Sequence, residues 1–307
     1  STFPQKELSL QKDRTVSTII EDESDPSDIS MNLFFKEIYK NYAYGYPSIG
    51  EKSIIKNISR KDIVNFYKNN LNQKTAKIAI VSSLSKKDVE ALSEKISKSL
   101  ERKDILVDKN TIQLKKDNKE KYIYKKFNSE QAHIYIGGLA IKRGAKNHLP
   151  LYVGNYIFGG SGFSARLMQE LRVKRGYTYG VYSYIYPMKN IGPFVIGIET
   201  KSEQAQISVE LIHNMLQEFI ENGPTNEEIK HAKEAIINGF PLRVDSNSDI
   251  LNYLSMINYY DLPMDYLAKF TENISKITKK DIISAFKEEI DYKNLTTLVV
   301  GNEKAKK

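Results

Sequence analysis

The chain has 307 residues, of which 40% are hydrophobic and 27% are charged, as in a folded globular protein rather than a disordered or fibrous one. Cysteine is absent, which excludes disulfides, thiol catalysis and cysteine metal sites. The apolar runs fall far short of the roughly 18 residues that a membrane span needs. We therefore expect no membrane span. The net charge of +8 comes from lysines that are interleaved with acidic residues along the chain, so we expect no nucleic-acid partner either.

Two stretches of the chain resemble each other at an offset of 219 residues, since residues 57–83 align without a gap on residues 276–302. In each copy a hydroxyl residue precedes an aspartate by three positions, Ser59 with Asp62 and Thr278 with Asp281. This pattern is typical of a capping box at the start of a helix. Each predicted helix leads into a short apolar strand, and the tripeptide Ser-Asp-Ile opens a helical stretch upstream of both copies, at 27–29 and 248–250.

The repeat predicts that the first copy is incomplete. In the second copy, strands and helices at about 120–220 precede the shared part, and nothing in the first copy corresponds to them. We therefore expect one and a half repeats: residues 1–108 as the C-terminal part of a first domain, 109–121 as a charged linker, and 122–307 as a complete second domain. The stretch 109–126 holds seven lysines against two acids, which is typical of a solvated linker.

The second domain alternates strand-like and helical patterns. Helices are expected at 149–158, 164–174 and 207–220, and Thr225 and Glu228 form a capping pattern for a further helix. Strands are expected at 121–127, 133–139, 178–186, 193–200 and 298–300. Strands and long helices in mixed order indicate an α+β fold.

The four histidines do not have the spacing of a zinc site. Catalytic zinc sites commonly place two histidines three or four residues apart on one helix, and His133, His148, His213 and His231 offer no such pair. We expect His213 and His231 on exposed helix surfaces, His133 in a strand and His148 in a loop. The sequence predicts no metal site in this chain.

A glycine-rich segment, Phe158–Phe163, precedes a helix and invites comparison with phosphate-binding loops. A P-loop would end in Gly-Lys-Ser or Gly-Lys-Thr, and a dinucleotide fingerprint would follow a strand. Neither condition holds here, so we expect a tight helix-to-helix turn.

The segment after that turn holds the candidate site residues. Arg172 lies in the last turn of a predicted helix, Gly176 ends it, and Tyr179 opens a strand. Period-two alternation would place Tyr179 on the same strand face as Val181 and Ser183. Arg172 and Tyr179 could together hold a peptide carbonyl or a developing oxyanion. An arginine near a helix C-terminus is also explained by the helix dipole alone, and the residues by themselves leave both interpretations open.

The segment FGGSGFSARLMQELRVKRGYTYGVYSY (158–184) resembles the second half of the insulinase/pitrilysin family of zinc peptidases. NYAYGYPSIG (41–50), NSEQAHIYIGG (128–138) and GPTNEEIKHAKEAIING (223–239) are similar to other segments of that family. The resemblance implies duplicated metallopeptidase domains, each a mixed or antiparallel sheet with helices packed on it, here one partial and one complete. It also implies that Arg172 and Tyr179 bind substrate and support catalysis from the half opposite the zinc.

The family's inverted zinc motif, His-x-x-Glu-His, has no match in this chain. We therefore expect zinc only in the intact enzyme or in a partner, and a peptide substrate. The partner would be a second peptidase-family chain, as in a dimer, or a missing N-terminal segment. The alternative is a non-catalytic partner or scaffold subunit of such an assembly. The family resemblance favours a periplasmic location, and a cytoplasmic location stays open as the alternative.

Overall fold

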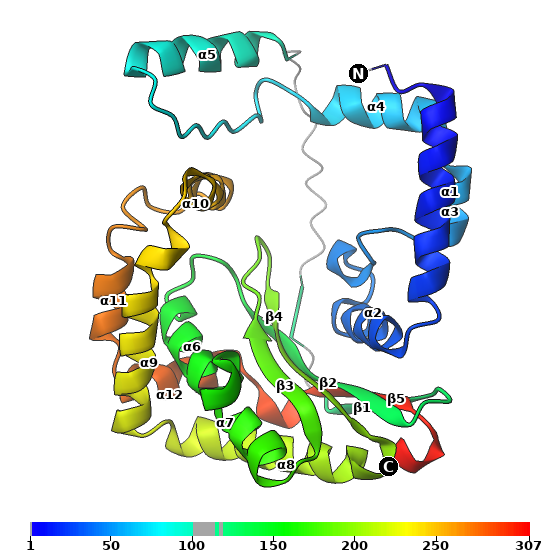
Figure 1. Ribbon diagram of the computed structural model, residues 1–307, viewed down its shortest axis with the longest axis vertical. Coiled ribbons are helices and arrows are strands. Elements are labelled where there is room, and N and C mark those ends of the chain that lie inside the picture. Colours follow the sequence, from blue (N-terminus) through cyan, green and yellow to red (C-terminus); the bar gives the residue numbers. More distant parts are fainter. Residues whose placement is uncertain (1, 101–113, 117–118) are drawn as a thin grey trace. The chain divides into compact units, whose positions relative to one another are not determined.

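The computed structural model describes residues 2–100, 114–116 and 119–307 (Figure 1). The chain forms two compact units built from interleaved segments. The first comprises residues 1–21, 48–112 and 240–267, and the second comprises residues 22–47, 113–239 and 268–307. Most of the predicted linker 109–121 lies outside the described residues. Within the described ranges, no helix combines the length and the apolar character needed to cross a bilayer.

A five-stranded mixed sheet organises the second unit. Its strands are β1 (Lys121–Lys126), β2 (Gln131–Ile141), β3 (Thr178–Ile185), β4 (Gly192–Lys201) and β5 (Thr296–Gly301). The order across the sheet is β1-β5-β2-β4-β3, in which β1 pairs parallel to β5 and all other neighbours are antiparallel. The five strands predicted in this region and the α+β class are confirmed.

One face of this sheet is covered by helices, because alternate residues of its strands are apolar. In β2 the residues Ala132, Ile134 and Ile136 are almost fully buried and belong to the main core. The helices of this unit that contribute side chains to that core are α6 (His148–Asn155), α7 (Arg166–Met168), α8 (Ala205–Asn222), α9 (Asn226–Gly239), α11 (Phe270–Lys276) and α12 (Lys279–Glu289).

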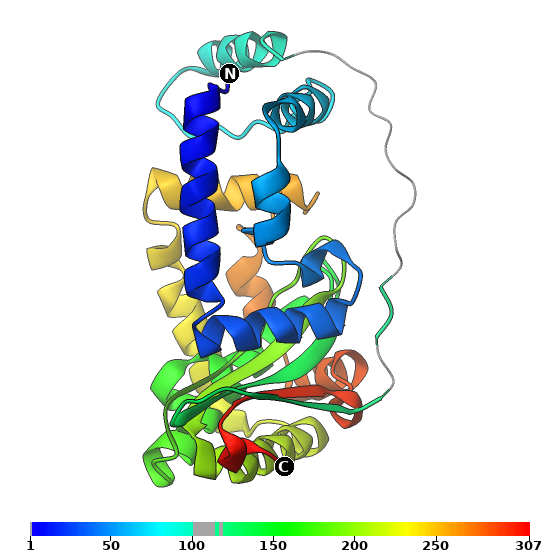
Figure 2. The ribbon, with the colours of Figure 1, turned by 90° about the vertical axis from the view of Figure 1, so that its right-hand side faces the viewer.

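Helix α2 (Pro26–Tyr39) packs on the opposite face, against β5 and β2, as Figures 1 and 2 show. Asp25 caps its N-terminus by accepting the backbone N–H groups of Ser27 and Asp28. Phe34 is fully buried in a second, smaller core with Tyr135 and Leu298. Because α2 packs on β5 and β2, the outer strands β4 and β3 keep part of this face accessible.

The first unit consists of helices and extended segments. Its helices are α1 (Gln5–Asp22), α3 (Lys52–Asn57), α4 (Arg60–Asn70), α5 (Lys86–Lys98) and α10 (Asn247–Tyr259). The short apolar strand expected after the helix of the first copy was wrong, since residues 78–81, the apolar run at that place, belong to no strand among the described residues. An extended segment becomes a strand only when a neighbouring backbone takes up its hydrogen bonds.

The predicted helix boundaries follow their capping residues. The capping boxes at Ser59 with Asp62 and at Thr278 with Asp281 are both present, and Thr225 and Glu228 exchange hydrogen bonds of 2.7 and 3.1 Å. The expected helix at 164–174 is a short α-helix, α7, continued by a π-helical turn at 169–174. The glycine-rich turn is also π-helical over 156–160, and Gly159 lies so close to Ser183 that a Cβ there would clash.

Gly137 provides a test of how tightly β2 and β4 pack. A Cβ at this position would lie 2.0 Å from the carbonyl oxygen of Phe194, a backbone atom that cannot move aside alone. We predict that Gly137→Ala lowers the free energy of unfolding by about 1–3 kcal/mol, measured by urea denaturation. The matched control is Gly138→Ala, whose Cβ would meet only Leu295 at 3.7 Å. Equal stability of the two variants would contradict this packing.

Candidate functional site

Arg172 and Tyr179 lie next to each other at the start of β3. The Nη1 atom of Arg172 donates a 2.6 Å hydrogen bond to the backbone carbonyl of Tyr179. The guanidinium also lies 4.5 Å from the centre of the Phe163 ring, within cation–π range. Gly176, with φ of +65°, makes the sharp turn that brings the strand back beside the helix end. The structure therefore brings the two predicted residues together, through the Tyr179 backbone.

A β-bulge at Tyr179 sets the direction of its side chain. Thr178 pairs with Thr200 and Gly180 with Glu199, so Tyr179 is the extra residue of the ladder. The Thr178 hydroxyl holds the bulge, because it accepts the Gly180 N–H at 2.9 Å and lies 2.5 Å from the Glu199 carbonyl oxygen. The expectation that Tyr179 shares a face with Val181 was wrong. Val181 is 3% exposed, whereas Tyr179 is 84% exposed.

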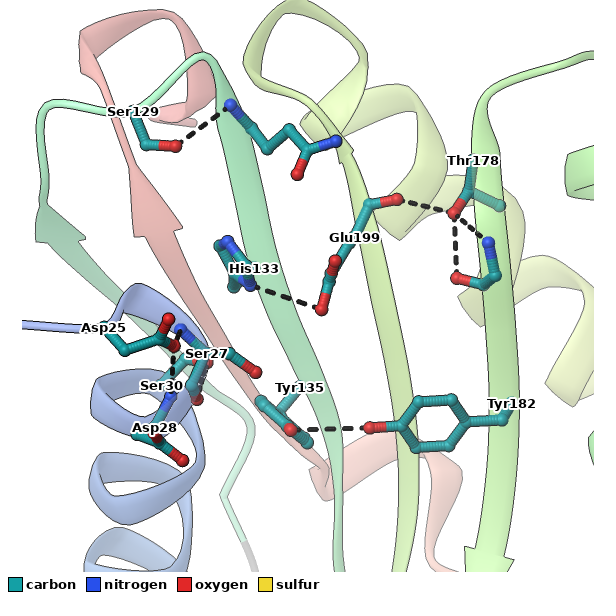
Figure 3. A network of polar contacts seen from close by, with 12 residues as sticks. Asp25, Ser27, Asp28, Ser30, Ser129, His133, Tyr135, Thr178, Tyr182 and Glu199 are labelled. Carbon is teal, nitrogen blue, oxygen red and sulfur yellow. Dashed lines mark hydrogen bonds and ion pairs between the residues drawn. The ribbon is translucent and has the colours of Figure 1, made fainter. Parts of the chain in front are cut away.

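A pocket of about 190 Å³ lies beside this bulge on the α2 face of the sheet (Figure 3). Its polar lining comes from the N-terminal end of α2 and from β2, β3 and β4, and it includes Ser27, Gln131, His133, Tyr135, Tyr179, Tyr182 and Glu199. The hydroxyls of Tyr135 and Tyr182 lie 3.4 Å apart. Burial raises the pKa of both phenols, so both stay protonated at neutral pH.

Within the pocket, His133 and Glu199 face each other across β2 and β4. They are paired in the strand register, and the Nδ1 atom of His133 lies 3.6 Å from a carboxylate oxygen of Glu199. The His133 side chain is 10% exposed and that of Glu199 is 56% exposed. The distance is too long for a hydrogen bond, so among the described residues the buried Nδ1 has no hydrogen-bond partner.

The four histidines lie in separate places and do not fit a zinc ion. His148 begins α6 rather than lying in a loop, and His213 is half-buried with its Nε2 3.0 Å from the Thr297 hydroxyl, not exposed as expected. His231 is on the surface, 3.4 Å from Glu227. The residues that the structure describes hold no group of three or more His, Asp or Glu suited to a metal. Zinc chemistry therefore has no ligand set among them.

Sequence reasoning singled out Arg172 and Tyr179 as candidates but did not predict the pocket beside them. His133 was assigned to a strand, and Tyr135, Tyr182 and Glu199 were not singled out. One signal was available in the segment 131–138, where His133 and Tyr135 alternate with fully apolar residues. Such alternation places two polar side chains on one face of an otherwise buried strand. Their meeting with Glu199 depends on strand register, which the sequence does not specify.

The comparisons with known proteins identify the class of fold and site. Residues 57–236, more than half of the chain, match the family described as the peptidase M16 inactive domain. The chain therefore belongs to this family of zinc-protease-like proteins, as the insulinase/pitrilysin resemblance predicted.

Individual relatives carry contrasting names. The chain is 27% identical over 318 residues to the "Non-peptidase homolog YmxG" of Helicobacter pylori, covering 99% of this chain and 70% of the relative. It is also 27% identical over 248 residues to the "Uncharacterized zinc protease YmxG" of Bacillus subtilis, covering 81% of this chain and 59% of that protein. A peptidase M16 inactive domain from Pseudomonas fluorescens superimposes with a TM-score of 0.93 at 28% identity, covering all of this chain and 73% of that one.

His148 predicts a measurable pH dependence of stability. Burial and, secondarily, the charge of Arg143 lower the pKa of His148 from 6.5 to about 4 in the folded chain. The unfolded chain therefore binds an extra proton between these values, and stability falls as the pH drops from 6.5 to 4. We expect His148→Gln to remove up to about 3 kcal/mol of this loss, measured by urea denaturation from pH 7 to pH 4. The control His231→Gln, at an exposed site, should keep the wild-type profile, and an unchanged profile for His148→Gln would contradict the assignment.

Proposed function

We propose that this chain is the part of an M16-type peptidase assembly that holds substrate but carries no zinc. The observation behind this proposal is the bulge that turns the Tyr179 phenol outward, next to an arginine anchored on its backbone. Tyrosine combines an apolar ring with a polar hydroxyl and is enriched at interfaces. An 84% exposed Tyr179 whose backbone carbonyl is held by Arg172 therefore favours a contact with another molecule.

The two residues would act on a peptide carbonyl in different ways. The Tyr179 hydroxyl would donate a hydrogen bond to the carbonyl oxygen, and the Arg172 guanidinium would add positive charge where negative charge develops. The Phe163 ring and the Tyr179 carbonyl hold that guanidinium in place beforehand. Zinc and its bound water would be supplied by another peptidase domain, since the described residues fit no metal. The substrate would be a peptide or an unfolded segment.

The second candidate is a non-catalytic scaffold subunit. The name of the Helicobacter relative, "Non-peptidase homolog", favours it, as does the description of the family as an inactive domain. Under this alternative Tyr179 would contact a protein partner and not a reacting peptide. In both cases the partner is a second peptidase-family domain. The periplasmic location stays a prediction.

We also propose that the chain is a duplication with one partial and one complete copy. Segment 22–47 belongs to the second unit and segment 240–267 to the first, so segments equivalent by the repeat are exchanged between the units. Helix α2 packs on β5, and α10 borders the equivalent residues Ile78–Ile80. Both helices are followed by a residue with positive φ, Lys40 at 52° and Asp261 at 53°. The segment 78–81 would then be the counterpart of β5, and it would pair with neighbouring strands supplied by another domain.

Substitutions in the assembled peptidase test the role of the two residues. We predict that Arg172→Ala and Tyr179→Phe each lower kcat/KM by about 10²-fold, because each removes an electrostatic interaction with the carbonyl oxygen that strengthens in the transition state. The measurement is peptide hydrolysis by this chain together with its zinc-bearing partner. Tyr184→Phe, at a 43% exposed tyrosine of the same strand, serves as the control. Unchanged kcat/KM with intact assembly would reject the substrate-holding role and favour the scaffold.

A further inference from the structure

Apart from Tyr179 itself, the residues that line the pocket are not used by the proposed carbonyl contact. Among its lining residues Glu199 is the one acidic side chain, and neither lysine nor arginine is present, in a chain with a net charge of +8. Tyr135, Tyr179 and Tyr182 contribute aromatic rings to the same small space. An acidic, aromatic pocket in a basic protein calls for a cationic ligand.

The buried Nδ1 atom of His133 narrows the class of ligand further. It has no hydrogen-bond partner among the described residues, and the imidazole is nine-tenths buried. In the tautomer that carries its hydrogen on Nε2, Nδ1 accepts a hydrogen bond. A ligand that replaced solvent here with an apolar group would leave this buried acceptor unpaired, which costs binding free energy. In that tautomer, a ligand with an N–H or O–H donor satisfies Nδ1 of His133.

The carboxylate of Glu199 supplies a second acceptor close to the first. Its oxygen lies 3.6 Å from His133 Nδ1, so two N–H groups of one ligand head can reach both atoms (Figure 3). A guanidinium or ammonium group has several donors and a positive charge, and it binds favourably against tyrosine rings. Glu199 is 56% exposed and so lies at the mouth of the pocket, where a side chain from solvent can enter.

We propose that this pocket binds a basic side chain, arginine or lysine, of a polypeptide held along the Tyr179 edge. The inference deepens the proposed function and rests on it for the polypeptide, because it names the side chain that the substrate would present beside Arg172 and Tyr179. The pocket takes the cationic head between His133, Glu199 and the tyrosine rings. Binding of that head needs neither zinc nor hydrolysis.

The test measures binding to the isolated full chain. The probes are three capped tripeptides, acetyl-Ala-X-Ala-amide with X as arginine, citrulline or norleucine, titrated by isothermal calorimetry. Citrulline keeps the shape of arginine but loses its charge. We expect the arginine peptide to bind at least about ten-fold more tightly than either neutral peptide, since charge-assisted hydrogen bonds are roughly twice as strong as neutral ones. A lysine peptide should also bind more tightly than norleucine.

Two variants connect binding to the pocket. Glu199→Gln and His133→Phe should each weaken binding of the arginine peptide by about ten-fold. Glu210→Gln, the same charge change at an exposed residue of α8, should not. Circular dichroism checks that each variant folds. If a variant does not fold, the comparison of arginine and citrulline peptides on the wild-type chain decides whether the pocket recognises the charge.

Three results would overturn the proposal: equal affinity for arginine and citrulline peptides, equal effects of Glu199→Gln and Glu210→Gln, or binding that appears only with added Zn²⁺. The last would assign His133 and Glu199 to a metal ion. Because no catalysis is measured, the pocket can bind basic peptides even if Arg172 and Tyr179 prove dispensable for hydrolysis. Conversely, failure of the chain to bind basic peptides would overturn the pocket proposal and leave the hydrolysis experiment on Arg172 and Tyr179 unaffected.

Discussion

The two-sided character of strand β2 determines how the second unit is built. On one side Ala132, Ile134 and Ile136 are almost fully buried against helices, and on the other His133 and Tyr135 meet α2 and the pocket. Successive side chains of a strand point to opposite faces. A single strand register therefore directs all five of these side chains to their faces of the sheet. In that register β4 comes so close to Gly137 that a Cβ there would meet the Phe194 carbonyl. A shift by one residue would bury the polar side chains in the main core.

From this register follows the position of the candidate site. Strand β4 carries Glu199 opposite His133, and β3 pairs with the outer side of β4. The bulge at Tyr179 interrupts the alternation of side chains at the start of β3, next to that pair, and turns the phenol away from the core. Helix α2 packs on β5 and β2. The accessible remainder thus combines an exposed tyrosine, an anchored arginine and an acidic pocket in one place.

Much of the fold could be predicted from the sequence because local signals were strong. Thr278 with Asp281 located a helix start, and strand-like runs of residues located β2 and β4. The exposure of Tyr179 could not be predicted, because a bulge depends on the Thr178 hydroxyl and its partners on β4. His213 was misplaced for a similar reason, since its contact with Thr297 comes from another element. Pairing partners far apart in the sequence decided both cases.

Amide hydrogen exchange of residues 78–81 tests most directly the central claim that this chain is completed by a zinc-bearing peptidase domain. In the chain alone, these extended but unpaired residues should exchange fast, while the buried amides of β5 exchange slowly. Adding a zinc-bearing M16-type domain that binds the chain should slow exchange at 78–81 toward the rate of β5, because neighbouring strands then take up the hydrogen bonds. Exchange at 78–81 that stays unchanged in a stable complex would contradict the account.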